Sequence, residues 1–73
     1  MLSYIQFTDL LQGGESRNRP GRAVDYIIVA DQDNTEVFYA EWPALDDEDA
    51  AGTRARVKAA YDRYRAGDSE YIL

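Results

Sequence analysis

The sequence contains no cysteine and no histidine among its 73 residues. Without cysteine no disulfide and no thiolate metal site can form, and without histidine the commonest general base and the commonest metal ligand are both missing. These two absences count against hydrolase triads, zinc centres and histidine-based pH switches. We therefore predict that the protein is not an enzyme, and we expect no catalytic residues, no metal and no cofactor.

Long apolar segments are also missing. No run approaches the roughly 20 apolar residues that a membrane-spanning helix needs, and the first residues, MLSYIQFTDLL, lack the basic leader of a signal peptide. A chain of this length can form one modest core. We expect a single domain over residues 1–73, no contact with a membrane, and a cytoplasmic location, which means the host cytoplasm if a phage encodes the protein.

Basic residues are absent from one long stretch. The whole chain has 14 acidic and 8 basic residues, a net charge of −6. Residues 1–22 and 52–73 carry net charges of +1 and +2, whereas residues 23–51 carry −9 with no base. The middle stretch would repel nucleic acid and anionic membranes and attract a basic protein surface. We therefore expect a protein partner with a basic surface and no direct binding of nucleic acid.

Residues that favour β-structure dominate three segments. The alternating segment 2–8, LSYIQFT, predicts a strand. Segments 23–31 and 36–42, AVDYIIVAD and EVFYAEW, predict a β-hairpin because the Asp- and Asn-containing turn at residues 32–35 joins them. Residues 12–22 contain Gly-Gly and Pro-Gly pairs, which predict a loop.

A long helix is predicted over residues 46–66. Acidic residues stand at its start, Arg63 and Arg65 stand in its last turn, and Gly67 is placed to end it. Its apolar face would consist of Ala50, Thr53, Val57, Ala60, Tyr61 and Tyr64. The tail 68–73 would add a short strand or fold back onto the core.

These elements predict an α+β fold. It would be a small antiparallel sheet of about three strands, with the central hairpin 23–42 and the C-terminal helix packed on one face. With Asp33 and Asn34 as turn residues, Val29 pairs with Phe38. One face then carries Ile27, Val29, Phe38, Ala40 and Trp42, and the other carries Val24, Tyr26, Ile28, Ala30, Val37 and Tyr39.

Both faces of this predicted sheet are largely apolar, and one helix can cover only one of them. The second face is therefore either an exposed patch, which is typical of an interface, or it is covered by the long loop and the tail. The sequence leaves both alternatives open.

The segment Asp31-Gln32-Asp33-Asn34-Thr35 is similar to the D-x-D-x-T signature of haloacid-dehalogenase-type phosphotransferases. In that family the motif leads from a strand into a loop and helix, whereas here it leads directly into another strand. A calcium loop is also a poor match, because Glu36 occupies the position that requires glycine. We interpret the segment as a hairpin turn.

In size, acidity and lack of cysteine, histidine and catalytic motifs, the chain resembles small phage-encoded anti-CRISPR-type inhibitor proteins. The resemblance implies stoichiometric inhibition, in which an acidic surface occupies a basic nucleic-acid-binding surface of a Cas effector complex. It also implies that this acidic surface could act as a mimic of DNA. The residues expected to bind the partner are the acids Asp31, Asp33, Glu36, Glu41, Asp46, Asp47, Glu48 and Asp49, with Tyr39 and Trp42 as aromatic anchors.

An alternative function is a small non-catalytic interaction module, of the antitoxin-like or virion-accessory kind. Such a module would dimerise through the apolar second face of the sheet. The sequence leaves open whether the protein is a monomer or a homodimer.

Overall fold

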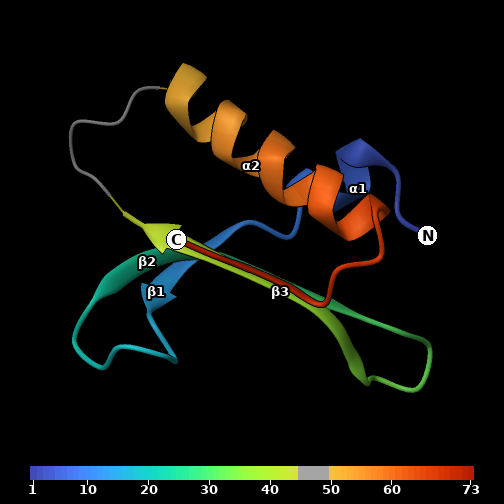
Figure 1. Cartoon of the computed structure of the whole chain (residues 1–73), viewed down its shortest axis with the longest axis horizontal. Helices are drawn as coiled ribbons and strands as arrows, with labels where there is room; N and C mark the ends of the chain where they lie inside the picture. Colours follow the sequence, from blue (N-terminus) through green and yellow to red (C-terminus); the bar gives the residue numbers. More distant parts are fainter. Residues whose placement is uncertain (45–49) are drawn as a thin grey trace.

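The computed structural model describes residues 1–44 and 50–73. Its elements are α1 (Tyr4–Thr8), β1 (Gln12–Glu15), β2 (Ala23–Ala30), β3 (Glu36–Pro43), α2 (Ala50–Arg65) and β4 (Glu70–Ile72). The described strands form one sheet in the order β1-β2-β3-β4, and both helices lie on the same side of it (Figure 1). The fold is therefore the predicted two-layer α+β type, with four strands where about three were expected.

The central hairpin has the predicted register. Ile27 lies opposite Ala40, Ile28 opposite Tyr39, and Val29 opposite Phe38. Next to Val29 the register shifts, so that Ala30 lies opposite Glu36 and the strands contain a β-bulge. The bulge lies at the hairpin end of the sheet.

The N-terminal segment corrects one prediction, because residues 2–8 contain the helix α1 and no strand. Ser3 caps this helix: its Oγ accepts a hydrogen bond from the Gln6 N–H, while the Gln6 side chain accepts one from the Ser3 N–H. Alternation would have buried Ile5 with Phe7, but Phe7 is fully buried and Ile5 is 73% exposed. The capping box and the burial of one helical face override the β-propensity of the segment.

The predicted loop 12–22 is also partly regular. Its first residues form β1, an edge strand that pairs antiparallel with residues 23–26 of β2. Gly14 suits this strand because the Tyr26 ring lies across it, and a Cβ at Gly14 would stand 3.0 Å from that ring. Residues 16–22 complete the connection to β2 as a loop.

The described part of the long helix ends as predicted. Gly67 has a φ of +90°, its N–H donates to the Tyr64 carbonyl, and the Asp68 N–H donates to the Arg63 carbonyl at 3.1 Å. The predicted helix start at residue 46 lies outside the described residues. After Gly67 the tail forms the short strand β4, which is one of the two alternatives predicted for it. This strand pairs parallel to β3, so the sheet is mixed and not purely antiparallel as predicted.

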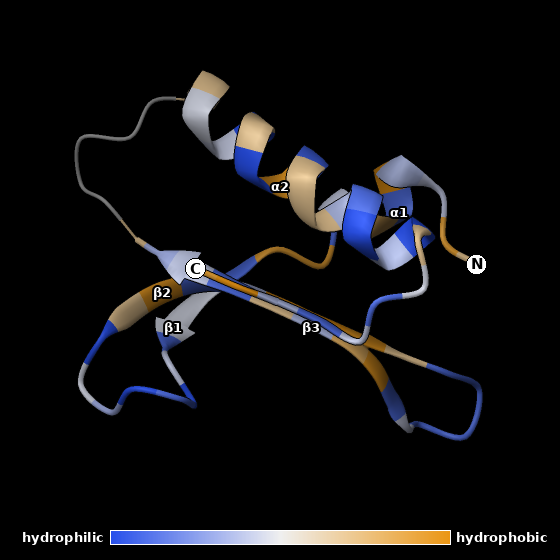
Figure 2. Ribbon diagram, in the orientation of Figure 1, coloured by the Kyte–Doolittle hydropathy of each residue, from blue (hydrophilic) through white to orange (hydrophobic). Residues whose placement is uncertain are grey.

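The core lies between the sheet and the helices. Its buried residues are Phe7, Ile27, Val29, Phe38, Ala40, Trp42, Val57, Ala60 and Tyr61. They include all five members of the first predicted sheet face, so this is the face that the helices cover. Aromatic rings of α1, β3 and α2 pack with centroids 5.2 to 6.0 Å apart. Hydrophilic residues gather in the hairpin turn and in the loop before β2 (Figure 2).

No helix within the described residues is both long enough and apolar enough to cross a membrane.

Candidate functional site

The hairpin turn presents two exposed carboxylates, Asp31 and Asp33, beyond the ends of β2 and β3. Asp31 also shapes the turn, because its Oδ1 accepts hydrogen bonds from the N–H groups of Asp33 (2.9 Å) and Thr35 (3.0 Å). Asn34 has a φ of 62°, a left-handed conformation that asparagine tolerates better than most residues. The turn is therefore both well defined and acidic.

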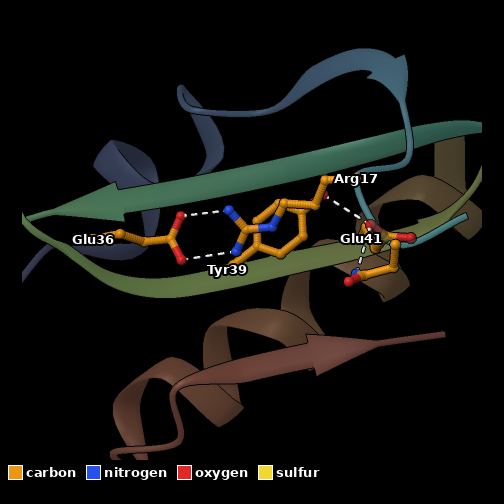
Figure 3. A network of polar contacts seen from close by, with 5 residues as sticks. Arg17, Glu36, Tyr39 and Glu41 are labelled. Atoms are coloured by element: carbon orange, nitrogen blue, oxygen red, sulfur yellow. Dashed lines mark hydrogen bonds and ion pairs between the residues drawn. The ribbon is translucent and has the colours of Figure 1, made fainter. Parts of the chain in front are cut away.

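The loop before β2 folds over the second face of the sheet, and Arg17 makes the main contact. Its guanidinium donates two hydrogen bonds of 2.8 Å to the Glu36 carboxylate and lies 3.4 Å from the centroid of the Tyr39 ring (Figure 3). Hydrogen bonding to Arg17 lowers the pKa of Glu36, and the same pair raises the pKa of Arg17. The charge of Glu36 is thus compensated within the protein.

Glu41 is a carboxylate with no exposed surface. Its oxygens accept hydrogen bonds from Ser16 Oγ (2.7 Å), Tyr39 Oη (2.8 Å) and Asn18 Nδ2 (3.2 Å). Burial alone would raise the pKa of Glu41, but these hydrogen bonds and the charge of Arg22 outweigh it, and the pKa is lowered. Burial, together with the hydrogen bond to Glu41, raises the pKa of Tyr39 to about 12.

These contacts correct three of the predicted binding residues. Tyr39 is only 3% exposed, beneath Arg17, and Glu41 and Trp42 are fully buried. Glu41 and Trp42 present no surface that a partner can reach in this structure, and Tyr39 presents only its small exposed part at the pocket described below. Trp42 belongs to the core. Asp31, Asp33 and Glu36 are exposed, while the predicted residues Asp46, Asp47, Glu48 and Asp49 lie outside the described residues.

The binding residues predicted from the sequence do not include Arg17, Ser16 or Asn18, the loop residues that organise this face. The available signal was Glu41 itself. A carboxylate between Ala40 and Trp42 in an apolar strand requires donors from elsewhere in the chain.

The part of the second face that stays open forms a pocket of about 230 Å³ beside β1. Its lining residues are Gly14, Glu15, Arg17, Tyr26, Ile28 and Tyr39. Ile28 is 37% exposed there, and the Tyr26 hydroxyl donates to Gln12 Oε1 at the edge of the sheet. The pocket combines an apolar floor with a charged rim.

The two layers differ in charge. The helix α2 contains five basic residues and one acidic residue, whereas residues 10–44 and 70–72, which include all four strands, contain seven acidic and three basic residues. In the described part of the chain, ion pairs join Arg17 to Glu36, Lys58 to Asp62 and Arg63 to Asp68. The exposed carboxylates there that make no ion pair are Asp9, Glu15, Asp31, Asp33 and Glu70.

Among residues 1–44 and 50–73, no three acidic side chains come together in a group able to hold a metal ion. The chain matches no protein-family model, no curated protein and no solved structure.

Proposed function

We propose that this protein is a non-catalytic inhibitor that binds a basic surface of a partner protein through the acidic sheet layer. The observation that carries this proposal is the surplus of carboxylates in that layer. Four exposed carboxylates of this layer, Glu15, Asp31, Asp33 and Glu70, make no ion pair in the described chain, and Arg17, which lies over Tyr39, is already held by Glu36. Uncompensated exposed charge of one sign attracts the opposite sign over about a Debye length.

Proteins that bind nucleic acid expose basic surfaces of the kind that this layer would attract. A protein that occupies such a surface competes with nucleic acid for it, so binding alone is sufficient for inhibition. The resemblance to anti-CRISPR-type proteins implies a Cas effector complex as the partner. Electrostatic attraction would speed the encounter and favour the correct orientation.

The alternative function, a module that dimerises through the second face, has weaker support. Tyr39 would have been central to such an interface, but Arg17 covers its ring. Ile28 and Val37 remain exposed, at 37% and 44%, and they leave a smaller apolar area than the sequence predicts.

The proposal is tested by capturing partners from a nuclease-treated host lysate on the immobilised protein. We expect a nucleic-acid-binding protein that is released by salt and by competing duplex DNA. Replacing both turn carboxylates, Asp31→Asn with Asp33→Asn, should weaken binding about three- to tenfold, as expected for two exposed charge contacts. Asparagine at position 31 keeps an oxygen that can accept the hydrogen bonds of the turn.

The matched control is Asp62→Asn with Asp68→Asn, which changes the net charge equally but on the helix side. If the partner resists salt, or if the control weakens binding as much as the turn variant, the acidic sheet layer is not the binding surface.

A further inference from the structure

The strand β2 is only half covered on the side away from β3. Its residues 23–26 pair with β1, but β1 begins at Gln12, opposite Tyr26. Leu10 and Leu11, which precede β1, pack against the core instead of extending the strand. Within the described chain, residues 27–30 of β2 therefore have no strand on that side, and Figure 1 shows β1 beside one end of β2 only.

The backbone of Ile28 points toward this open side. The Ala44 N–H donates to the Ala23 carbonyl at 3.1 Å, so the backbone polar groups of Ala23 face the side on which β3 lies. Antiparallel strands alternate, so Ile27 also bonds toward β3, while Tyr26 and Ile28 direct their N–H and C=O groups away from it. Tyr26 meets β1 at Gln12, and Ile28 meets no strand of the described chain.

A specific pocket adjoins this open edge. Ile28 and Tyr26 form part of the floor of the 230 Å³ pocket, and Gly14 and Glu15 of the edge strand line its side. A strand added beside Ile28 would direct every second side chain toward the same face of the sheet. One of those side chains would therefore lie over the pocket and contact Tyr26 and Ile28.

The charges around the edge are acidic. Glu15 lies at the pocket, Asp31 directly follows the open half of β2, and Asp33 follows in the turn; all three are exposed. The one base that lines the pocket, Arg17, is neutralised by Glu36. A second copy of this chain would bring the same acids against one another, and like charges disfavour that pairing. A basic segment would meet charges of the opposite sign.

We propose that the open edge of β2 binds an extended basic segment of the partner as an added β-strand, with an apolar side chain in the pocket beside Ile28. This inference rests on the proposed function, since it specifies how the basic partner is held. Backbone hydrogen bonds to Ile28 would supply the affinity of strand addition, and the pocket would supply its selectivity. At about 3.3 Å per residue, the open half of β2 accommodates roughly four residues of the partner.

The test uses synthetic peptides of about seven residues with alternating valine and lysine. This length extends past both ends of the open edge. One peptide has an unmodified backbone, and the other carries N-methyl groups on the amides of one edge. The two peptides have the same charge and side chains, so only their ability to pair as strands differs. We expect the methylated peptide to bind about tenfold more weakly, the effect of losing about two backbone hydrogen bonds.

Amide exchange locates the binding. In the free protein we expect the Ile28 amide to exchange faster than those of Ile27 and Val29, which bond toward β3, and to become protected when the unmodified peptide binds. The matched variants are Ile28→Thr, which fills less of the pocket floor with apolar groups, and Ile5→Thr, which makes the same change at an exposed residue of α1. Only Ile28→Thr should weaken binding.

The outcomes separate the two proposals. If both peptides bind equally, the binding weakens with salt and Ile28 stays unprotected, strand addition is wrong while the acidic-surface function stands. If the Ile28 amide is already protected in the free protein, or if neither peptide binds, the edge site is wrong. The partner-capture experiment with the turn variants then decides the proposed function independently.

Discussion

At the scale of single residues, Glu41 is the buried charge whose removal tests how the loop is held to the sheet. Its carboxylate is fully buried and accepts hydrogen bonds from Ser16, Asn18 and Tyr39, so it fastens the loop to the sheet. We predict that Glu41→Gln lowers the free energy of unfolding by about 2 kcal/mol at neutral pH. The glutamine amide replaces one accepting oxygen by an NH2 group, which cannot accept the hydrogen bonds that the surrounding side chains donate. Urea unfolding followed by the fluorescence of Trp42, the only tryptophan, measures this change.

The pH dependence gives a second signature of the same residue. The pKa of Glu41 is lowered below its ordinary value of 4.5, so its ionised form stabilises the fold above that pH. This contribution is lost as the pH falls through the lowered pKa, and the difference between Glu41→Gln and the unchanged protein should shrink there. Glu36→Gln in the same strand is the control, with an effect of about 0.5 kcal/mol or less because Glu36 is exposed. Equal effects of the two variants would contradict a structural role for Glu41.

At the scale of elements, α1 shows how a local signal can outweigh propensity. We predict that Ser3→Ala lowers the free energy of unfolding by about 1 kcal/mol, because it removes the hydroxyl that caps the helix and leaves the Gln6 N–H without its acceptor. Thermal unfolding measures the change. Ser3→Asp, which keeps a capping oxygen, should retain most of the stability. If Ser3→Ala has no effect, the docking of Phe7 alone holds α1 in place.

The elements that the sequence predicted correctly are those with a strong and consistent pattern. The predicted register holds from Ile27 to Val29, and the end of α2 followed from Gly67. The predicted two-residue turn at Asp33 and Asn34 is wrong, because the Asn34 N–H donates to the Asp31 carbonyl and the bulge pairs Ala30 with Glu36. The strand predicted for segment 2–8 is wrong because the alternation of Ile5 and Phe7 favours a strand, whereas the capping pair Ser3 and Gln6 favours a helix and prevails.

The candidate site was less predictable than the fold, for a physical reason. Alternation placed Trp42 on one apolar face with Ile27, but both faces were apolar, so the sequence did not show which one the helices cover. The covering of Tyr39 by Arg17 joins residues 22 positions apart and depends on the loop conformation. No local pattern contains that information.

At the scale of the whole molecule, the sequence carries a net charge of −6, and the described structure has principal extents of 34 × 27 × 18 Å. The Debye length is about 30 Å at 0.01 M salt and about 8 Å at 0.15 M. Low salt therefore leaves repulsion across the whole molecule largely unscreened. The described ion pairs join atoms within 4 Å, so added salt weakens them less than it weakens the long-range repulsion. Repulsion between like charges destabilises a compact state relative to an unfolded chain.

We therefore predict that the free energy of unfolding rises with salt over this range, by roughly 0.5–1 kcal/mol, the scale of interactions between exposed charges. Asp31→Asn with Asp33→Asn reduces the net charge and should reduce the rise, as measured by urea unfolding at the two salt concentrations. A fall in stability with salt would mean that attraction between neighbouring charges dominates. The proposed function would then lose its physical basis, because the repulsion that destabilises the fold and the attraction for a basic partner arise from the same uncompensated carboxylates.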